Sequence, residues 1–257
     1  MSAFSQVDSA PDPERLISFL DHAARAEWGM KQYAAGVLTV DAPALPILDV
    51  GCGAGHDLAL LASEGARAVG VDASARMLER AKRRVDGRLA VLVRATGERL
   101  PFRDQAFGGC RMERLLMHVT DPAAVIEEAV RCLTPGAQLT LCEPDWSSLR
   151  VRAAHGDEKV GWITSSRHPG VGADLWRLAE EAGCQVLDRV EELSVWRSLE
   201  VLDRIVGGID QAVTGAALAG RVSKQIAEAW LHEQRARDER GEFLGFLPKI
   251  LVVAQRK

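Results

Sequence analysis

The chain has 257 residues, a mass of 27.9 kDa, 47% hydrophobic and 26% charged residues, and a formal net charge of −4. This globular composition suits one large domain with a substantial core, and the length disfavours two equal domains. The acidic balance also disfavours nucleic acid as a partner, because the summed field would repel a phosphate backbone.

No targeting or membrane signal is visible in the sequence. The first 13 residues lack a basic start followed by an apolar run, and no stretch approaches about 18 uninterrupted apolar residues. The five cysteines are scattered without a C-x-x-C pair, which favours free thiols in a reducing compartment over a metal site. We therefore expect a cytoplasmic protein without metal or membrane contact, present as a monomer or homodimer.

Helical and strand patterns alternate through the first half of the chain. One or two helices are expected over residues 15–38, before a break at 41–46. The alternating strands and helices that follow predict a mostly parallel sheet with right-handed crossovers and helices on both faces. These elements are expected at residues 47–50, 56–64, 68–71, 75–85, 89–93, 107–112, 121–133 and 138–142.

The second half is less regular. A polar, punctuated stretch is followed by a helix, an alternating strand, two helices and a last apolar strand. Helices inserted before the last strand would lie over the carboxyl ends of the sheet and form a lid. The stretch and these elements are expected at residues 143–167, 172–182, 184–196, 199–213, 219–237 and 250–254.

A glycine-rich turn follows the first predicted strand and opens a helix. It reads Ile47-Leu48-Asp49-Val50-Gly51-Cys52-Gly53-Ala54-Gly55. Glycines there let a ligand approach the backbone, and the helix N-terminus offers free N–H donors. Because His56 stands where G-x-G-x-x-G requires glycine, the spacing argues against a dinucleotide site. A plain turn that binds no ligand is the alternative.

An acid, Asp72, ends the second predicted strand, about twenty residues after the first glycine, at the spacing expected for a ribose-binding carboxylate. Such a carboxylate can accept hydrogen bonds from both ribose hydroxyls of an adenosine. It can equally cap the helix that begins near Ser74, so the pairing with the glycine turn is what favours the ligand role.

These motifs resemble those of the class I S-adenosylmethionine-dependent methyltransferases, closest to the small-molecule enzymes of ubiquinone, menaquinone and natural-product biosynthesis. The resemblance covers residues 46–146. It implies a Rossmann-like, mostly parallel seven-stranded sheet with an antiparallel last strand and helical lid insertions. We expect one domain over residues 1–257, comprising an N-terminal helical lid (1–45), a cofactor-binding core (46–146), and acceptor-pocket insertions with the last two strands (147–257).

The resemblance implies S-adenosyl-L-methionine as cofactor and assigns residues to it. The glycine turn would contact its methionine half and Asp72 its ribose. The turn Thr96-Gly97-Glu98 is similar to the family's adenine-binding segment, with Thr96 in place of the usual aspartate. The implied cofactor residues are Asp49, Gly51, Cys52, Gly53, Gly55, Asp72, Ala73, Ser74, Met77, Thr96, Gly97, Glu98, Met112 and Glu113.

Catalytic and acceptor residues are expected beyond the fourth and fifth strands. His118 is the candidate base, or else a histidine hydrogen-bonded to backbone or to the cofactor carboxylate. Glu143 and Asp145 would orient an amine or hydroxyl beside an apolar wall at Trp146, or else solvate and cap a loop. Tyr33 and His168 are further candidates for the acceptor pocket.

The expected function is methyl transfer to an O, N or C nucleophile of a small, partly apolar metabolite, by in-line displacement with or without a general base. One alternative is an enzyme that binds S-adenosylmethionine but catalyses a reaction other than methylation. A nicotinamide-dependent oxidoreductase is disfavoured, because Tyr33 is the only tyrosine and no Tyr-x-x-x-Lys pair exists. A nucleic-acid methyltransferase would need an Asn-Pro-Pro-Tyr-like motif, which is absent.

Overall fold

The computed structural model describes residues 8, 28–40, 44–153 and 156–257, so most of the predicted N-terminal lid lies outside the described residues. Within the described ranges, nine strands form one sheet. Their bounds are β1 Ile47–Val50, β2 Ala68–Asp72, β3 Ala90–Arg94, β4 Phe107–Glu113, β5 Leu133–Pro144, β6 Arg150–Ala153, β7 Gly156–Lys159, β8 Cys184–Trp196 and β9 Gly245–Arg256.

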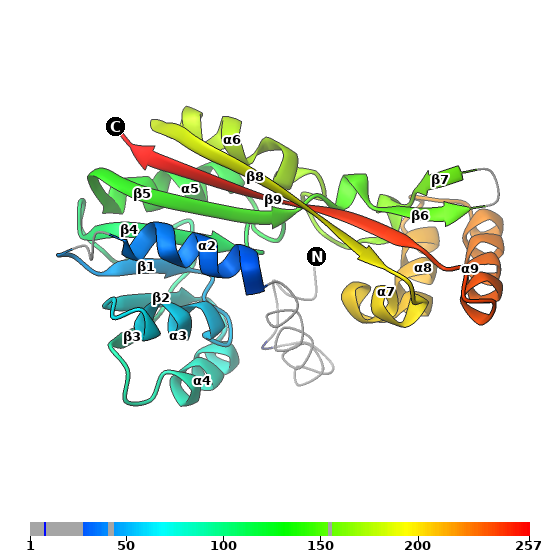
Figure 1. Ribbon diagram of the computed structural model, residues 1–257, viewed down its shortest axis with the longest axis horizontal. Coiled ribbons are helices and arrows are strands. Elements are labelled where there is room, and N and C mark those ends of the chain that lie inside the picture. Colours follow the sequence, from blue (N-terminus) through cyan, green and yellow to red (C-terminus); the bar gives the residue numbers. More distant parts are fainter. Residues whose placement is uncertain (1–7, 9–27, 41–43, 154–155) are drawn as a thin grey trace.

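The sheet has a parallel half and an antiparallel half, in the order β3-β2-β1-β4-β5-β9-β6-β7, with β8 on the other edge of β9 (Figure 1). Strands β1 to β5 pair in parallel, whereas β9 is antiparallel to both β5 and β8. The predicted mostly parallel sheet with an antiparallel last strand is confirmed. Its carboxyl edge, where β1, β2, β4 and β5 end, is the place where open α/β sheets bind ligands.

Helices cover both faces of the sheet. α2, α3 and α4 lie on one face, and α5 and α6 on the other (Figure 1). Local chemistry sets where they begin: Asp121 accepts hydrogen bonds from the amides of Ala123 and Ala124, and Pro122 opens α5. The bounds are α2 Trp28–Thr39, α3 His56–Ser63, α4 Ala75–Arg84, α5 Pro122–Cys132 and α6 Val171–Glu181.

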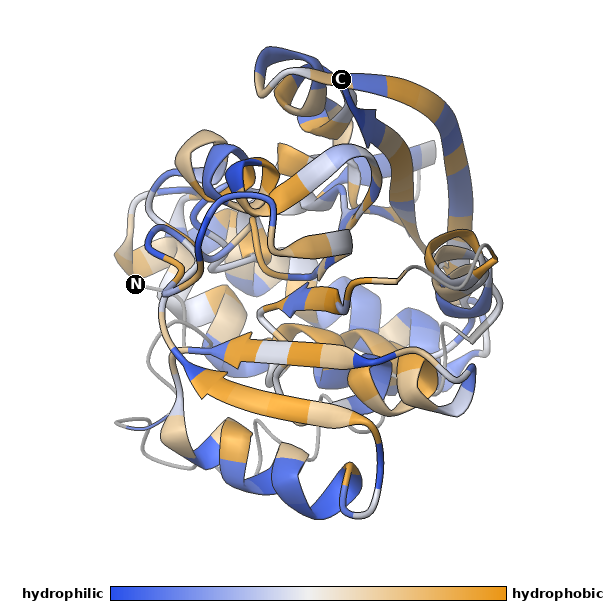
Figure 2. Cartoon of the chain, turned by 90° about the vertical axis from the view of Figure 1, so that its left-hand side faces the viewer, coloured by the Kyte–Doolittle hydropathy of each residue, from blue (hydrophilic) through white to orange (hydrophobic). Residues whose placement is uncertain are grey.

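The inner strands carry most of the apolar core. Figure 2 shows their ribbons mainly in orange, whereas outer helices such as α4 carry long blue stretches. Leu48 of β1, Leu139 of β5 and Val252 of β9 are fully buried. Helices cover both faces of the sheet, so side chains on both sides of the parallel strands are removed from water. This is why the sequences of these strands are continuous apolar runs.

The region expected to form two helices before the last strand contains three: α7 Leu199–Val206, α8 Ile209–Leu218 and α9 Lys224–Glu239. The predicted helix over residues 199–213 is wrong because Gly207 and Gly208, both at positive φ, end α7 and turn the chain into α8. The glycine pair was the visible signal for this break.

The sheet contains nine strands where seven were expected. The two additional strands, β6 and β7, form a hairpin inside the stretch that looked irregular from sequence. β6 pairs with β9 only through Arg150 and Val151, and every residue of β7 is exposed. A hairpin with so little buried surface leaves no apolar pattern to detect.

Helices α7, α8 and α9, together with the hairpin β6–β7, lie beyond the carboxyl ends of β4 and β5, and we call this group the cap (Figure 1). The short 3-10 helix Trp146–Ser148 leads from β5 into the cap, and a second one, Gly161–Ile163, follows β7 on the way to α6. The Trp162 ring packs edge-on against Trp230 of α9, with centroids 5.3 Å apart. No helix in the described parts of the chain combines the length and apolarity that a membrane crossing requires.

Two glycine-to-alanine substitutions, one at the close contact between α6 and the end of β5 and one on α8, should have opposite effects on the free energy of unfolding. A Cβ on Gly172 of α6 would lie 3.0 Å from the Glu143 carbonyl oxygen and 3.1 Å from the Asp145 amide nitrogen. Around Gly215 of α8, no described atom lies within 4 Å of the added Cβ. We expect Gly172→Ala to lower the free energy of unfolding by about 1–3 kcal/mol through overpacking. Gly215→Ala should raise it by up to about 1 kcal/mol through helix propensity. Urea denaturation measures both, and stabilisation by Gly172→Ala would contradict the close packing.

Candidate active site

The turn between β1 and α3, residues 51–55, is here called the glycine loop, and its three glycines have positive φ angles of 75°, 51° and 79°. A Cβ on Gly51 would lie 2.9 Å from Leu115 Cδ1, and one on Gly55 would lie 2.9 Å from Ala81 Cβ. Gly53 is different. Among described atoms, its added Cβ would meet only the Gly51 carbonyl oxygen, at 4.0 Å. The backbone at Gly53 therefore faces open space that a ligand can fill.

Asp72, at the end of β2, ties the glycine loop to the start of α4. Its Oδ2 accepts a hydrogen bond from the Gly53 amide at 2.9 Å, and its Oδ1 accepts one from the Ser74 amide at 2.8 Å. Burial raises the pKa of Asp72 against the opposing effect of these amides. Ser74, and not Asp72, caps α4, because Ser74 Oγ accepts the hydrogen bond from the Met77 amide. Asp72 instead holds the Ser74 backbone, and its carboxylate lies beside the glycine loop, where a ribose contact would need it.

Asp49 of β1 is a buried acid with an unused oxygen. It is 2% exposed, and its Oδ2 finds no hydrogen-bond partner among the described residues. Burial raises its pKa to about 7, although the positive charge of Arg111 acts in the opposite direction. A buried acceptor left unpaired is costly, so this atom suits a ligand donor such as an ammonium group.

The other residues expected around the methionine half and ribose also lie at this edge. Cys52 is buried, its Sγ would lie 2.9 Å from a Cβ on Gly70, and burial raises its thiol pKa, so it fills space and is not a nucleophile. Met112 is fully buried in β4. Met77 is buried in α4, and its amide donates to Ser74 Oγ at 3.2 Å.

The predicted adenine segment follows β3. Thr96 and Glu98 are exposed, and Thr96 forms an isolated bridge with Arg99. A Cβ on Gly97 would lie 2.9 Å from Val125 Cγ1, so close packing requires glycine at this position. Ala73 is exposed, and its carbonyl accepts a hydrogen bond from Arg94 Nε at 3.1 Å.

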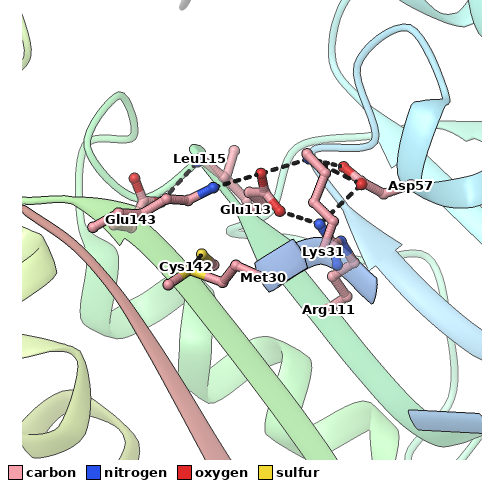
Figure 3. Close-up of polar contacts among 9 residues, drawn as sticks. Met30, Lys31, Asp57, Arg111, Glu113, Leu115, Cys142 and Glu143 are labelled. Carbon is pink, nitrogen blue, oxygen red and sulfur yellow. Dashed lines mark hydrogen bonds and ion pairs between the residues drawn. The ribbon is translucent and has the colours of Figure 1, made fainter. Parts of the chain in front are cut away.

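Five charged residues from the four elements α2, α3, β4 and β9 meet next to the glycine loop, and we call them the charge cluster; Figure 3 labels all of them except Lys249 of β9. Lys31 Nζ of α2 lies 2.9 Å from both carboxylate oxygens of Asp57 and 2.5 Å from Glu113 Oε1. Arg111 of β4 pairs with the same two acids, and lies 3.0 Å from Asp57. Lys249 of β9 lies 3.2 Å from Glu113 Oε1.

Glu113 is the centre of this cluster. Burial opposes its ionisation, but Lys249, Lys31 and Arg111 together hold its pKa well below the usual value. The sequence analysis named Glu113 as a neighbour of the methionine moiety and missed its partners. An arginine inside a buried strand was the one available signal, because a buried charge requires a partner.

Glu143, at the end of β5, is fully buried and holds the chain segment that follows β4. Its Oε1 accepts hydrogen bonds from the amides of Leu115 at 2.7 Å and Leu116 at 2.6 Å. Burial raises its pKa to about 8 despite these two bonds. The sequence analysis offered orientation of the acceptor or capping of a loop, and the observed contacts are those of a loop anchor. Its Oε2 has no hydrogen-bond partner among the described residues.

Asp145 and Trp146 depart from the acceptor-pocket expectation. Asp145 Oδ1 accepts from the Ser147 amide at 3.1 Å and from Ser147 Oγ at 2.5 Å, which is the loop-capping alternative. Trp146 is 4% exposed and belongs to the main core, where its Nε1 donates to Met117 Sδ at 3.3 Å. The indole therefore packs in the core, and its expected role as an apolar wall of the acceptor pocket stays a prediction.

Of the two candidate histidines, His118 lies in the connection that follows β4, and His168 lies beside that connection. Burial and the neighbouring positive charge of Arg114 lower the pKa of His118 to about 3, so its imidazole is neutral at physiological pH. His168 Nε2 lies 3.2 Å from the Val119 carbonyl oxygen and 3.3 Å from that of Thr120. His168 thus braces the segment that carries His118.

Tyr33 is placed away from the glycine loop. Its ring is 44% exposed on α2, and its hydroxyl donates to Asp188 Oδ2 of β8 at 2.6 Å. Lys31 is the side chain that α2 turns toward the charge cluster, and the acceptor contact expected of Tyr33 stays a prediction.

Comparisons with known proteins agree with this fold. A family described as "Methyltransferase domain" matches residues 48–141. An uncharacterized 37.1 kDa protein in transposon TN4556 of Streptomyces fradiae is 33% identical over 254 residues, which cover 93% of this chain and 71% of that protein. A demethylmenaquinone methyltransferase of Tropheryma whipplei is 35% identical over 143 residues, 54% of this chain and 56% of that enzyme.

A solved structure from Bacillus halodurans C-125 with a provisional methyltransferase name superposes with a TM-score of 0.63. The alignment covers 89% of this chain and 99% of that one at 18% identity, which shows the shared fold. The chain belongs to the class I S-adenosylmethionine-dependent methyltransferases. Members of this family are enzymes whose cofactor is S-adenosylmethionine.

The residues at the carboxyl edge fit this cofactor. The open side of Gly53 provides room for a ligand against the backbone, and the unpaired oxygen of Asp49 matches the charge of an amino-acid ammonium group. Asp72 presents a carboxylate at the distance along the chain that a ribose contact requires. This fit can be tested by counting the protons that Asp49 releases when the ligand binds.

If Asp49 receives the ammonium group, S-adenosylhomocysteine should release protons on binding. The free acid has a pKa of about 7, and pairing with a cation lowers it. Release should approach about one proton near pH 5.5 and decline as the pH rises above about 7. Calorimetry in buffers with different ionisation enthalpies counts the protons. Asp49→Asn should bind more weakly and release none, and equal release by both proteins would remove Asp49 from the ligand contact.

Proposed function

We propose that this enzyme transfers the methyl group of S-adenosylmethionine to an oxygen, nitrogen or carbon atom of a small, partly apolar metabolite held between the carboxyl edge of the sheet and the cap. The observation that carries the proposal is the open backbone at Gly53 beside the unpaired oxygen of Asp49. The cap lies beyond the same edge, where an acceptor would be enclosed (Figure 1).

In the proposed arrangement the methionine half rests on the glycine loop, and its ammonium group contacts Asp49. The ribose lies at Asp72, whose position next to the Gly53 amide supports this placement. The adenine lies toward the turn after β3, with Met77 of α4 as an apolar neighbour. The N-terminus of α3 has no side-chain cap, and an anionic group of the ligand would lie favourably at this end of the helix.

The bound cofactor supplies a methyl group that its sulfonium already activates. The protein therefore has to align the acceptor atom in line with that methyl group and exclude water. The cap is suited to the second task, because α7, α8 and α9 are packed on a shared interior that includes Leu202, Val213 and Trp230. One relative is named for demethylmenaquinone, which supports a small-molecule acceptor for this chain.

A proton acceptor is required only if the acceptor atom loses a proton. His118 is neutral, but a pKa of about 3 makes it a weak base. Glu143 has a raised pKa and one unpaired oxygen, but both features lie in a fully buried position. We therefore propose that alignment, and not general-base catalysis by His118, accounts for most of the rate.

The function is tested by incubating the enzyme with a metabolite extract and S-adenosylmethionine labelled in its methyl group. We expect a labelled small-molecule product heavier than its precursor by one CH2, and equimolar S-adenosylhomocysteine. A product of altered structure without the label would establish a non-methylating reaction instead. Asp72→Ala, which should weaken cofactor binding by about 1–3 kcal/mol, serves as the low-affinity control.

Once the acceptor is identified, His118→Gln tests the alignment proposal. Because the His118 imidazole is already neutral above about pH 5, kcat at saturating substrates should keep the wild-type pH profile, whatever its absolute size. The profile is measured from about pH 5.5 to 8.5 in both proteins. A wild-type acidic limb near the unperturbed histidine pKa of about 6.5 that disappears in His118→Gln would make His118 the base.

A further inference from the structure

We propose that Lys31 is a positioning residue that fastens α2 across the cofactor site, so that α2 becomes more firmly docked when the cofactor binds and retains it. The inference rests on the proposed placement of the cofactor on the glycine loop. Lys31 was not among the residues selected from the sequence. It lies on α2, the helix that also carries Tyr33, which was expected to contact the acceptor.

Lys31 contacts both walls of the proposed methionine site. Asp57 belongs to the first turn of α3, the helix that begins directly after the glycine loop. Glu113 is the last residue of β4, and the following segment carries Leu115, which packs against Gly51. Figure 3 shows the Lys31 side chain reaching from α2 to these two acids. A shift in either wall would therefore change the contacts of Lys31.

Lys31 is the only member of the charge cluster that belongs to α2. Arg111 binds the same two acids from within β4, and Lys249 also binds Glu113. Arg111 and Lys249 are therefore fixed by the sheet, whereas Lys31 connects the sheet to a covering helix. The remaining support of α2 includes the exposed hydrogen bond from Tyr33 to Asp188 of β8 and apolar contacts such as those of Met30 and Ala34 with Leu251.

This arrangement makes Lys31 replaceable without stranding a buried charge. When Lys31 is removed, Asp57 keeps Arg111, and Glu113 keeps Arg111 and Lys249. Removing Arg111 would instead leave both acids with less compensation inside the core. The loss of Lys31 should therefore weaken the attachment of α2 more than it weakens the fold.

Linkage gives the expected consequence. If α2 docked through Lys31 favours the bound cofactor, then the cofactor must favour the docked α2 by the same factor. Lys31→Met should raise the Kd of S-adenosylhomocysteine about tenfold, mainly through faster dissociation. Because the ion pairs are buried, this loss should change little between low and high salt.

The experiment compares Lys31→Met, Lys31→Arg and the control Lys224→Met by calorimetry, stopped-flow dissociation and hydrogen exchange. Lys224 makes a 3.7 Å pair with Glu228 on the exposed surface of α9, so its loss tests the same chemical change away from the site. In the wild type, S-adenosylhomocysteine should increase the protection of the α2 amides. Lys31→Met should lose most of that increase, Lys31→Arg should recover part of it, and Lys224→Met should behave as the wild type.

A double-mutant cycle with Asp57→Asn tests whether Lys31 affects cofactor binding through its contact with Asp57. If Lys31 acts through Asp57, adding Lys31→Met to Asp57→Asn should weaken binding much less than it does in the wild type.

Unchanged affinity and α2 protection in Lys31→Met would overturn the proposal. A Lys31→Met protein that is destabilised equally with and without ligand would also overturn it, by giving Lys31 a purely structural role. Failure of the wild type itself to bind S-adenosylhomocysteine would instead overturn the placement of the cofactor.

Discussion

The buried charges of Lys31, Arg111 and Glu113, together with the partly buried Asp57, impose the constraint on which the arrangement of the site depends. Charged groups removed from water must be paired, because the loss of hydration is not recovered by packing alone. Here the pairs join α2, α3 and β4, so these three elements are stable only when their ends meet (Figure 3). The glycine loop lies between two of them, and its position follows from this pairing as well as from the strand that precedes it.

The ionisation of the buried acids divides the carboxyl edge into regions of different charge. Glu113 is held ionised by three cations, whereas burial raises the pKa of Asp49 at one end and Glu143 at the other. Asp49 can ionise when a cationic group arrives beside its free oxygen. Glu143 already uses one oxygen to hold the segment that carries His118, so its raised pKa is consistent with a structural acid in neutral form. A buried carboxylic acid thus supports a loop at one strand end and receives the ligand in the proposed site at another.

Features formed by residues that lie close together in the sequence were predicted correctly. The turn from Asp49 to Gly55 and the acid at Asp72 depend on short spacings and on glycine conformations, and the structure brings them together as expected. The charge cluster joins residues separated by 26, 82 and 136 positions, and no local pattern links them. The contacts of Trp146 were not predictable for a related reason. Its position after β5 was correct, but the direction of its side chain depends on a 3-10 turn and on Met117 far away in the chain.

The cap shows how sequence regularity and function diverge in this fold. The parallel strands are identified by continuous apolar runs because both of their faces are covered. The cap is built from short helices separated by glycines and from a hairpin with an exposed outer strand, so it contributes little periodicity. Its interior joins the main apolar core through residues such as Leu202 and Trp230. Acceptor recognition in the cap can therefore vary through the lengths of its helices and turns, while the ion pairs beside the glycine loop keep the cofactor edge in place.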